Sequence, residues 1–410
     1  MTTIDGRPRG IDVATRWKEA GRVLELDGYL VLMTAALLGI WIVVNIITGG
    51  LFLTPRNLWN LAVQTSVVGI CATGMVFVIV ARQIDLSIGS IVGFCGVVMA
   101  LVQTRYLPAG TPWAWLATVL VGIVLGAVIG AFQGWWTSYR GVPSFIVTLG
   151  GLLIFRGLAW WVSEGATIAP LDPMFQRLGG GLDGAIGAAW SWVIGIAAML
   201  LLVIRCIIRR RKSARYGFPL RPLWAEGLVS GVGLVLIAGF VMVMNAYLQP
   251  RTNIPQGIPI PVLILIAAVL VMTLVARHSA FGRHVYAIGG NPEAATLAGI
   301  PTKRMILLIL TLMGALSGLA GAVATARLNA GVNSTGTLLE LQVIAAAVIG
   351  GTALAGGAGS VTGAILGALI IQSLQSSMAL MNVPSPLQSV VLGLVLIGAV
   401  WVGTFNQRRG

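Results

Sequence analysis

The sequence predicts an all-α, polytopic membrane protein with about 12 transmembrane helices (roughly 10 to 14), some of them broken or re-entrant. Of its 410 residues, 57% are hydrophobic and 9% are charged, and the mean hydropathy is +0.93. A soluble domain carries about 25% charged residues. Apolar runs long enough to cross a bilayer recur along the chain, and basic residues separate many of them.

The predicted spans follow these apolar runs. The run at 340–355 is short for a span, and the run at 86–104 begins irregularly. The twelve runs lie near 29–49, 61–81, 86–104, 114–137, 143–163, 190–208, 224–247, 260–276, 304–326, 340–355, 361–381 and 387–404.

The distribution of basic residues predicts the topology. With a cytoplasmic N-terminus, twenty basic residues lie on the cytoplasmic side, five face outward, and Arg156 alone falls within a span. Because cytoplasmic loops are enriched in Lys and Arg, both termini are expected to be cytoplasmic. The predicted organisation is an N-terminal segment over 1–28, expected to be retained, a transmembrane domain over 29–404, and a tail over 405–410.

The segment 180–250 is expected to add two spans joined by a basic loop, which contains Arg209-Arg210-Arg211-Lys212. Such a run can bind nucleic acid, but it more often anchors a loop at the anionic cytoplasmic leaflet. Since the other basic residues also lie between apolar runs, the lipid bilayer is the expected partner and nucleic acid is not. The three cysteines are expected to be buried, without a disulfide framework.

Enzymatic chemistry has little support in this sequence. None of the three lysines follows a glycine, so a Walker A phosphate loop is impossible, and ATP-driven work would need a separate subunit. The histidines His278 and His284 form no metal-ligand pattern, and no nucleophile elbow is present. We therefore expect no catalytic residues, no metal site and no cofactor in this chain.

A short polar helix is predicted within the basic loop 277–304. Asn291 is a good N-cap, Pro292 suits the first helical position, and the helix dipole favours an anion at Glu293. Gly299 can end the helix in a left-handed conformation. A membrane protein that places such a helix on its cytoplasmic face offers it to a partner, although an ordinary loop helix is the alternative.

Polar residues near the start of the run at 86–104 are candidates for a translocation path or gate. Asp85, followed by Ser87 and Ser90, lies between two apolar runs. Ionisable residues at such a depth are costly and are often functional. The alternative is that Asp85 caps the next span at the interface and pairs with Arg82. Capping and function are compatible.

A second candidate region is the span that begins at Pro143 and contains Thr148 and Arg156. Arg156 either reaches outward beside Trp160 and Trp161 or lines a wet cavity, where it would bind hydroxyl groups or steady a gating loop. The structural role is slightly favoured.

The stretch from 341 to 367 is rich in small residues and is interrupted by glycine pairs, so a broken or re-entrant element is expected. Thr352, Ser360, Thr362 and Gln372 supply uncharged hydrogen-bonding groups here, which suit a polyhydroxylated neutral solute better than an ion. The pentapeptide 359–363 also echoes 89–93, as in transporters built from duplicated halves with broken helices.

Several blocks together resemble the permeases that import ribose, xylose, arabinose and galactose. Glu293-Ala294-Ala295, followed after three residues by Gly299, resembles the coupling-loop signature of bacterial ATP-binding-cassette importers. The blocks at 74–90, 143–157, 281–300 and 345–367 occur in family order, and the similarity covers most of the chain from about residue 55.

The resemblance implies a dimeric permease of the bacterial inner membrane. It implies that Asn291 to Gly299 seats in a cytoplasmic ATPase subunit, which uses ATP and Mg, and that a periplasmic binding protein delivers the sugar. Shorter family members lack a counterpart of 180–250, and the xylose permeases resemble the longer form, so D-xylose is the expected substrate.

Three other functions are compatible with the sequence. They are a related permease for a nucleoside or a branched-chain amino acid, a stand-alone ion-coupled transporter, and a membrane-embedded enzyme. Asp85 and Arg156 provide few charges for ion coupling, and no clustered catalytic set supports an enzyme.

Overall fold

The structure is a computed structural model that describes residues 28–107, 111–181, 183–218, 222–249 and 252–407. The expectations for 1–27 and 408–410 lie outside these residues. The helices, in chain order, are α2 (Gly28–Ile47), α3 (Pro55–Val80), α4 (Ile88–Leu101), η1 (Val102–Tyr106), α5 (Ala114–Tyr139), α6 (Ser144–Ser163), α7 (Pro173–Gln176), η2 (Arg177–Gly179), α8 (Gly187–Arg215), α9 (Leu223–Ala246), α10 (Ile260–His278), α11 (Ala280–Gly290), α12 (Pro292–Leu297), α13 (Thr302–Leu328), α14 (Leu339–Ile349), α15 (Val361–Leu380) and α16 (Ser385–Gln407).

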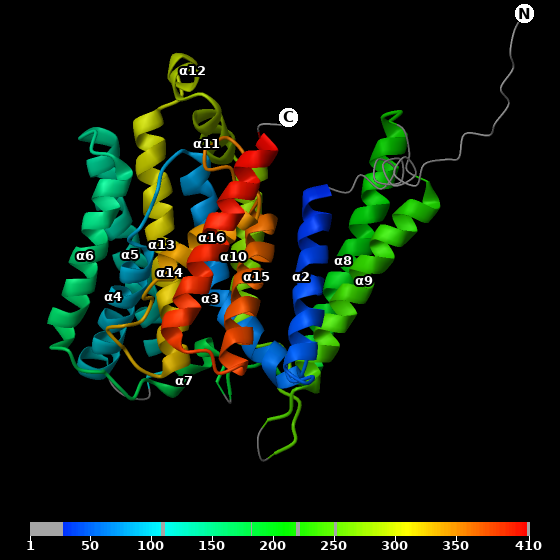
Figure 1. The fold of residues 1–410 in the computed structure, drawn as a ribbon, viewed down its shortest axis with the longest axis horizontal. Helices are drawn as coiled ribbons and strands as arrows, with labels where there is room; N and C mark the ends of the chain where they lie inside the picture. The colour runs from blue at the N-terminus through cyan, green and yellow to red at the C-terminus, as the bar shows by residue number, and fades with distance from the viewer. Residues whose placement is uncertain (1–27, 108–110, 182, 219–221, 250–251, 408–410) are drawn as a thin grey trace, which may run out of the picture.

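The all-helical, polytopic prediction is confirmed. Ten helices in the described part of the chain are long and apolar enough to cross a membrane. The two remaining predicted spans correspond to shorter apolar helices, Leu339–Ile349 and the stretch Ser385–Gly398 of α16. The long helices run roughly parallel in Figure 1, and α12 projects beyond one end of the bundle.

The centre of the bundle is formed by α3 and α13. In the most apolar window of α3, 89% of the residues are buried, which is the highest share among the spanning helices. Helix α13 packs on α5 through glycines that face each other: a Cβ added to Gly314 would lie 2.1 Å from the carbonyl oxygen of Gly126. Small residues allow this close approach, which replaces the hydrophobic driving force that is missing between helices in lipid.

The broken element predicted over 341–367 is present. Helix α14 ends at Ile349 and α15 begins at Val361, and the turn between them contains Gly351, Gly356 and Gly357 at φ values of 86°, 86° and 77°. These left-handed conformations favour glycine, since a side chain would be strained there. In the same way, the non-helical segment 83–87 separates α3 from α4.

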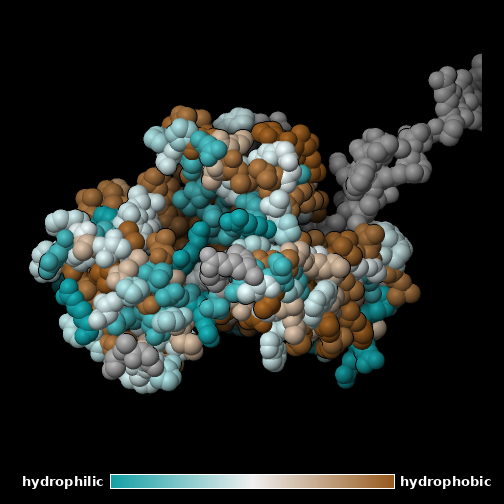
Figure 2. Space-filling model, turned by 90° about the horizontal axis from the view of Figure 1, so that it is seen from below, coloured by the Kyte–Doolittle hydropathy of each residue, from teal (hydrophilic) through white to brown (hydrophobic). Residues whose placement is uncertain are grey.

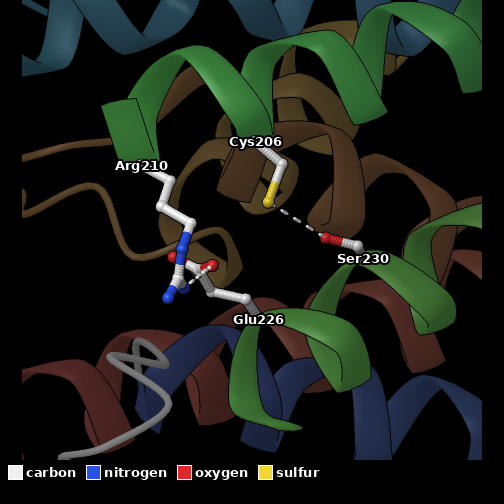
Figure 3. Close-up of polar contacts among 4 residues, drawn as sticks. All are labelled: Cys206, Arg210, Glu226 and Ser230. Carbon is white, nitrogen blue, oxygen red and sulfur yellow. Dashed lines mark hydrogen bonds and ion pairs between the residues drawn. The ribbon is translucent and has the colours of Figure 1, made fainter. Parts of the chain in front are cut away.

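The segment 180–250 contains α8 and α9, which form a hairpin at the side of the bundle (Figure 1). The two helices are joined near one end by an ion pair between Arg210 and Glu226, and the Ser230 hydroxyl donates to the Cys206 sulfur at 3.5 Å (Figure 3). The loop that follows α9 is fixed to α3, because the Trp59 indole donates to the Gly257 carbonyl at 3.0 Å.

Candidate functional site

The short helix predicted in the loop 277–304 is α12, and its capping is as expected. The Asn291 side chain accepts a 3.0 Å hydrogen bond from the Ala294 backbone N–H, and Pro292 occupies the first turn. Gly299 has a φ of +80°, and the Ile300 N–H returns to the Ala295 carbonyl. These bonds satisfy backbone groups that a six-residue helix would otherwise leave open.

One residue of the predicted coupling segment, Ala295, does not lie on the exposed face of α12. Ala295 is buried at 5% exposure and packs in the main core cluster, so it faces the chain's own body. Glu293 and Ala294 are exposed, and Leu297 is 91% exposed. A leucine so exposed on a small, well-capped helix is the feature of α12 best suited to insert into a partner. The sequence pattern did not single it out.

A tight junction connects α11 and α12 to the rest of the bundle. The Arg82 guanidinium donates to the carbonyls of Gly289 and Gly290 at 2.7 and 2.8 Å, so the suggested pairing of Arg82 with Asp85 is wrong. The Gly357 N–H donates to the Val80 carbonyl at 2.9 Å. A Cβ on Gly289 would lie 1.8 Å from that same oxygen, so the end of α3, the end of α11 and the α14–α15 turn are in direct contact.

Asp85 is 1% exposed and belongs to a buried polar network at the start of α4. Its carboxylate accepts from the Ser87 N–H at 2.8 Å and from the Ser87 hydroxyl at 2.7 Å. The Gln133 amide of α5 donates to Ser87 at 2.9 Å, and the Ser90 hydroxyl donates to the Ser87 carbonyl. The carboxylate therefore holds the first turn of α4 through Ser87, in an Asx-type turn.

Thr148 contributes to the same region from α6. Its hydroxyl donates to the Ser144 carbonyl at 2.9 Å and to the Ile84 carbonyl at 3.2 Å, and the Ser144 hydroxyl accepts from the Ile84 N–H. Buried backbone groups need such partners. The segment 83–87 before α4 is thus held by the combined hydrogen bonds of four predicted path residues, Asp85, Ser87, Ser90 and Thr148.

Arg156 binds backbone near the opposite end of the bundle. One of its guanidinium nitrogens donates to the carbonyls of Asn333 and Thr335, at 2.8 and 2.9 Å. The Ser163 hydroxyl also donates to the Asn333 side chain. Of the roles considered for Arg156, the geometry matches the steadying of a loop, here the loop between α13 and α14.

Thr352 and Ser360 lie in the α14–α15 turn. Thr352 is buried, and its hydroxyl has no hydrogen-bond partner among the described residues. Ser360 caps α15 by accepting from the Gly363 N–H at 3.3 Å. Next to them the Tyr286 hydroxyl of α11 donates to the Gly359 carbonyl at 2.8 Å, and burial raises the pKa of Tyr286. Both residues therefore belong to the end of the bundle that carries α12.

The chain has a polar pocket that none of these predicted path residues lines, although Arg156 hydrogen-bonds to Thr335, which does line it. Its cavity has a volume of about 260 Å³ and is formed by α3, α13, α14, α15 and the loop before α14. It lies toward the face opposite α12, and Figure 2 shows hydrophilic side chains gathered in a hollowed band across the middle of that face. The lining residues are Gln64, Val67, Val68, Ala324, Arg327, Leu328, Thr335, Gly336, Leu339, Gln342, Gln372 and Gln375.

Of these lining residues, the sequence points to Gln372 alone, as one uncharged hydrogen-bonding group among several. The other three glutamines lie far apart along the chain and follow no motif, so their convergence depends on how α3, α14 and α15 pack. A usable signal would have been glutamine within otherwise apolar spans, since an amide in lipid needs a partner.

The fold and these sites define a polytopic transport protein with an exposed helix at one end and a polar pocket toward the other. A protein family described as "Branched-chain amino acid transport system / permease component" matches residues 57–400, and the chain belongs to this family. No solved structure matches the chain.

Curated relatives in this family are named as sugar permeases. The chain is 38% identical to the xylose transport system permease protein XylH of Escherichia coli strain K12 over 379 residues, which is 92% of each chain. It is 38% identical to the Haemophilus influenzae protein of the same name over 94% of this chain and 98% of that one. The Escherichia coli ribose import permease protein RbsC is 30% identical, over 87% and 88% of the two chains.

Proposed function

We propose that this chain is the transmembrane permease subunit of an ATP-binding-cassette importer in the bacterial inner membrane. It moves a monosaccharide, which we propose is D-xylose, from the periplasm to the cytoplasm. The structural observation that carries the proposal is α12, with Leu297 exposed at its tip. The names of the xylose and ribose relatives support the class of substrate.

In this proposal a separate cytoplasmic ATPase, which uses ATP and Mg, receives α12. Leu297 fills an apolar depression on the ATPase, and Glu293 lies at its rim. A periplasmic binding protein delivers the sugar on the opposite face. The permease forms no covalent intermediate, because its task is to convert the movement of the ATPase into opening and closing of a path.

In this proposal, the contacts around Gly289 transmit the movement of α12 to the rest of the bundle. When α12 moves with the ATPase, α11 displaces the Arg82 side chain and the end of α3, and with them the turn between α14 and α15. Contacts this tight transmit displacement, since packed elements shift between arrangements rather than deform continuously. This movement would produce alternating access between two copies of the chain. In one of the two states the polar pocket would be open to the periplasm.

Two copies are proposed because one chain encloses the polar pocket incompletely. The Arg327 side chain, which lines the pocket, is exposed in the single chain. A second copy packed against this side would complete the wall of a shared path.

Co-purification tests the proposal. The tagged chain, extracted from its native membrane, is expected to recover a Walker-motif ATPase, and L297D is expected to lose it because a charge would enter an apolar contact. The matched control is L51D, which changes an exposed leucine in the loop between α2 and α3. Loss of the ATPase from both variants, or from neither, would contradict the assignment of α12.

Import of a branched-chain amino acid is the second candidate, because the family description names it. The pocket argues against it, since no carboxylate lines the cavity to bind an α-ammonium group. Competition of labelled sugar uptake by leucine or xylose separates the two substrates.

A further inference from the structure

We propose that the pocket between α3, α13, α14 and α15 is a monosaccharide-binding site of the permease itself. This inference rests on the proposed function and deepens it, because it assigns sugar recognition to the membrane subunit as well as to the binding protein.

The first argument is the set of amides that converge on the cavity. Gln372, on α15, is 4% exposed, and its amide donates to Gln342 at 3.1 Å and to Gln375 at 2.9 Å. The Gln372 oxygen and the amide nitrogens of Gln342 and Gln375 have no partner among the described residues. Sugar hydroxyls, which both donate and accept, match this combination of open groups.

The second argument is that further polar groups at the cavity have no partner. The Thr335 hydroxyl is buried, and nothing in the described part of the chain hydrogen-bonds to it. The Gln64 amide and the Arg327 guanidinium likewise form no hydrogen bond with the rest of the described chain. Buried polar groups are normally paired, so the open oxygen of the buried Gln372 amide and the Thr335 hydroxyl indicate a ligand at this cavity. The Gln64 and Arg327 side chains are more exposed and are accessible to such a ligand.

The charge of the lining selects the class of ligand. Arg327 is its one ionisable residue, and four amides and a hydroxyl form the rest of the polar surface. A cation would meet a positive charge without a carboxylate, whereas a neutral polyol uses all of these groups. The remaining wall, including Val67, Val68 and Leu339, is apolar and fits the C–H face of a sugar ring.

The volume of the cavity and the affinity expected from its lining also fit a transport path for a monosaccharide. The volume of about 260 Å³ is close to the lower end of ligand pockets, about 300 Å³, so one sugar ring fits better than a disaccharide. The described lining contains no aromatic ring, so we expect weak binding. A transport path requires weak binding, because the solute must leave as readily as it arrives.

Arg156 is a positioning residue for this site. It holds the carbonyls of Asn333 and Thr335, and both Thr335 and Gly336 line the cavity. The tether therefore sets the wall of the pocket that comes from the loop between α13 and α14.

The experiment uses the complex of permease, ATPase and binding protein in proteoliposomes. ATP-dependent uptake of xylose by the wild-type complex is measured first. Without that uptake the proposed function fails, whatever the variants do. With it, the Q64L/Q375L variant is expected to transport about tenfold less xylose per ATP hydrolysed. The sugar-loaded binding protein should still stimulate its ATPase activity. The matched control Q249L, in the loop after α9, should behave as wild type.

A binding measurement shows whether Gln64 and Gln375 contact the sugar or only stabilise the fold. Saturation-transfer NMR with D-xylose alone is expected to show contact with the purified wild-type permease and a much weaker signal with Q64L/Q375L. Gln375→Asn, which keeps the amide, should retain part of the signal. Equal signals from wild type and Q64L/Q375L, or a variant that transports xylose normally, would overturn the proposal.

Discussion

The Arg82 guanidinium donates a 2.7 Å hydrogen bond to the carbonyl of Gly289, and this bond joins the end of α3 to the last turn of α11. Helix α11 leads directly into α12, so the bond lies between the proposed ATPase contact and the most buried helix of the bundle.

Replacement of Arg82 tests this link. R82Q removes the charge-assisted bonds to Gly289 and Gly290, which are partly solvated, and we expect a loss of about 1 kcal/mol of coupling. Sugar transported per ATP should fall about fivefold. The ATPase should still co-purify, because α12 is unchanged. Normal stoichiometry in the variant would show that the junction does not transmit movement.

Asp85 distinguishes an importer driven by ATP from a transporter driven by ions. D85N keeps an oxygen that can accept from Ser87, so folding and uptake should stay close to wild type. D85A leaves the Ser87 N–H unpaired and should cost about 1–3 kcal/mol of stability. Thermal unfolding and uptake measure the two effects. Abolished uptake in a well-folded D85N protein would favour ion coupling.

The loop held by Arg156 gives a third prediction. R156Q weakens the bonds to the Asn333 and Thr335 carbonyls, and the pocket wall should lose its fixed position. We expect normal membrane insertion with at least a severalfold fall in uptake. Proteolysis of the loop should also become faster than in wild type; equal rates would contradict the tether.

Two glycines provide a matched pair for helix packing. G314A places a Cβ 2.1 Å from the Gly126 carbonyl oxygen and should destabilise the protein by about 1–3 kcal/mol. A Cβ on Gly157, in α6, meets no atom within 4 Å, so G157A should be neutral or slightly stabilising. Detergent stability of the purified variants compares them directly. Equal effects would contradict the close α5–α13 contact.

The pair between Arg210 and Glu226 should contribute little. Both side chains are partly exposed, at 32% and 16%, and such pairs contribute about 0–1 kcal/mol. E226Q should therefore leave yield and unfolding temperature nearly unchanged. A large loss of stability would show that the hairpin depends on this ion pair.

Features encoded by local chemistry could be predicted from the sequence. The caps of α12 follow from Asn291, Pro292 and Gly299, whose preferences act within one turn. The spans follow from apolar length, and the broken α14–α15 element follows from glycine pairs that make a poor helix.

Features that depend on packing could not be predicted. The burial of Ala295 and the exposure of Leu297 are set by how α12 rests on the bundle. Arg82 is close to Asp85 in sequence, yet it bonds to carbonyls about two hundred residues away. The polar pocket combines side chains from four helices and a loop, and no spacing along the chain predicts that they converge.

ATP-dependent sugar accumulation tests the central claim most directly. The chain, the ATPase that co-purifies with it and a sugar-loaded periplasmic binding protein are reconstituted in proteoliposomes, and labelled D-xylose inside the vesicles is measured with and without ATP. We predict accumulation only with ATP and only when Leu297 is intact. Xylose movement by the chain alone, without ATP or the ATPase, would contradict the account.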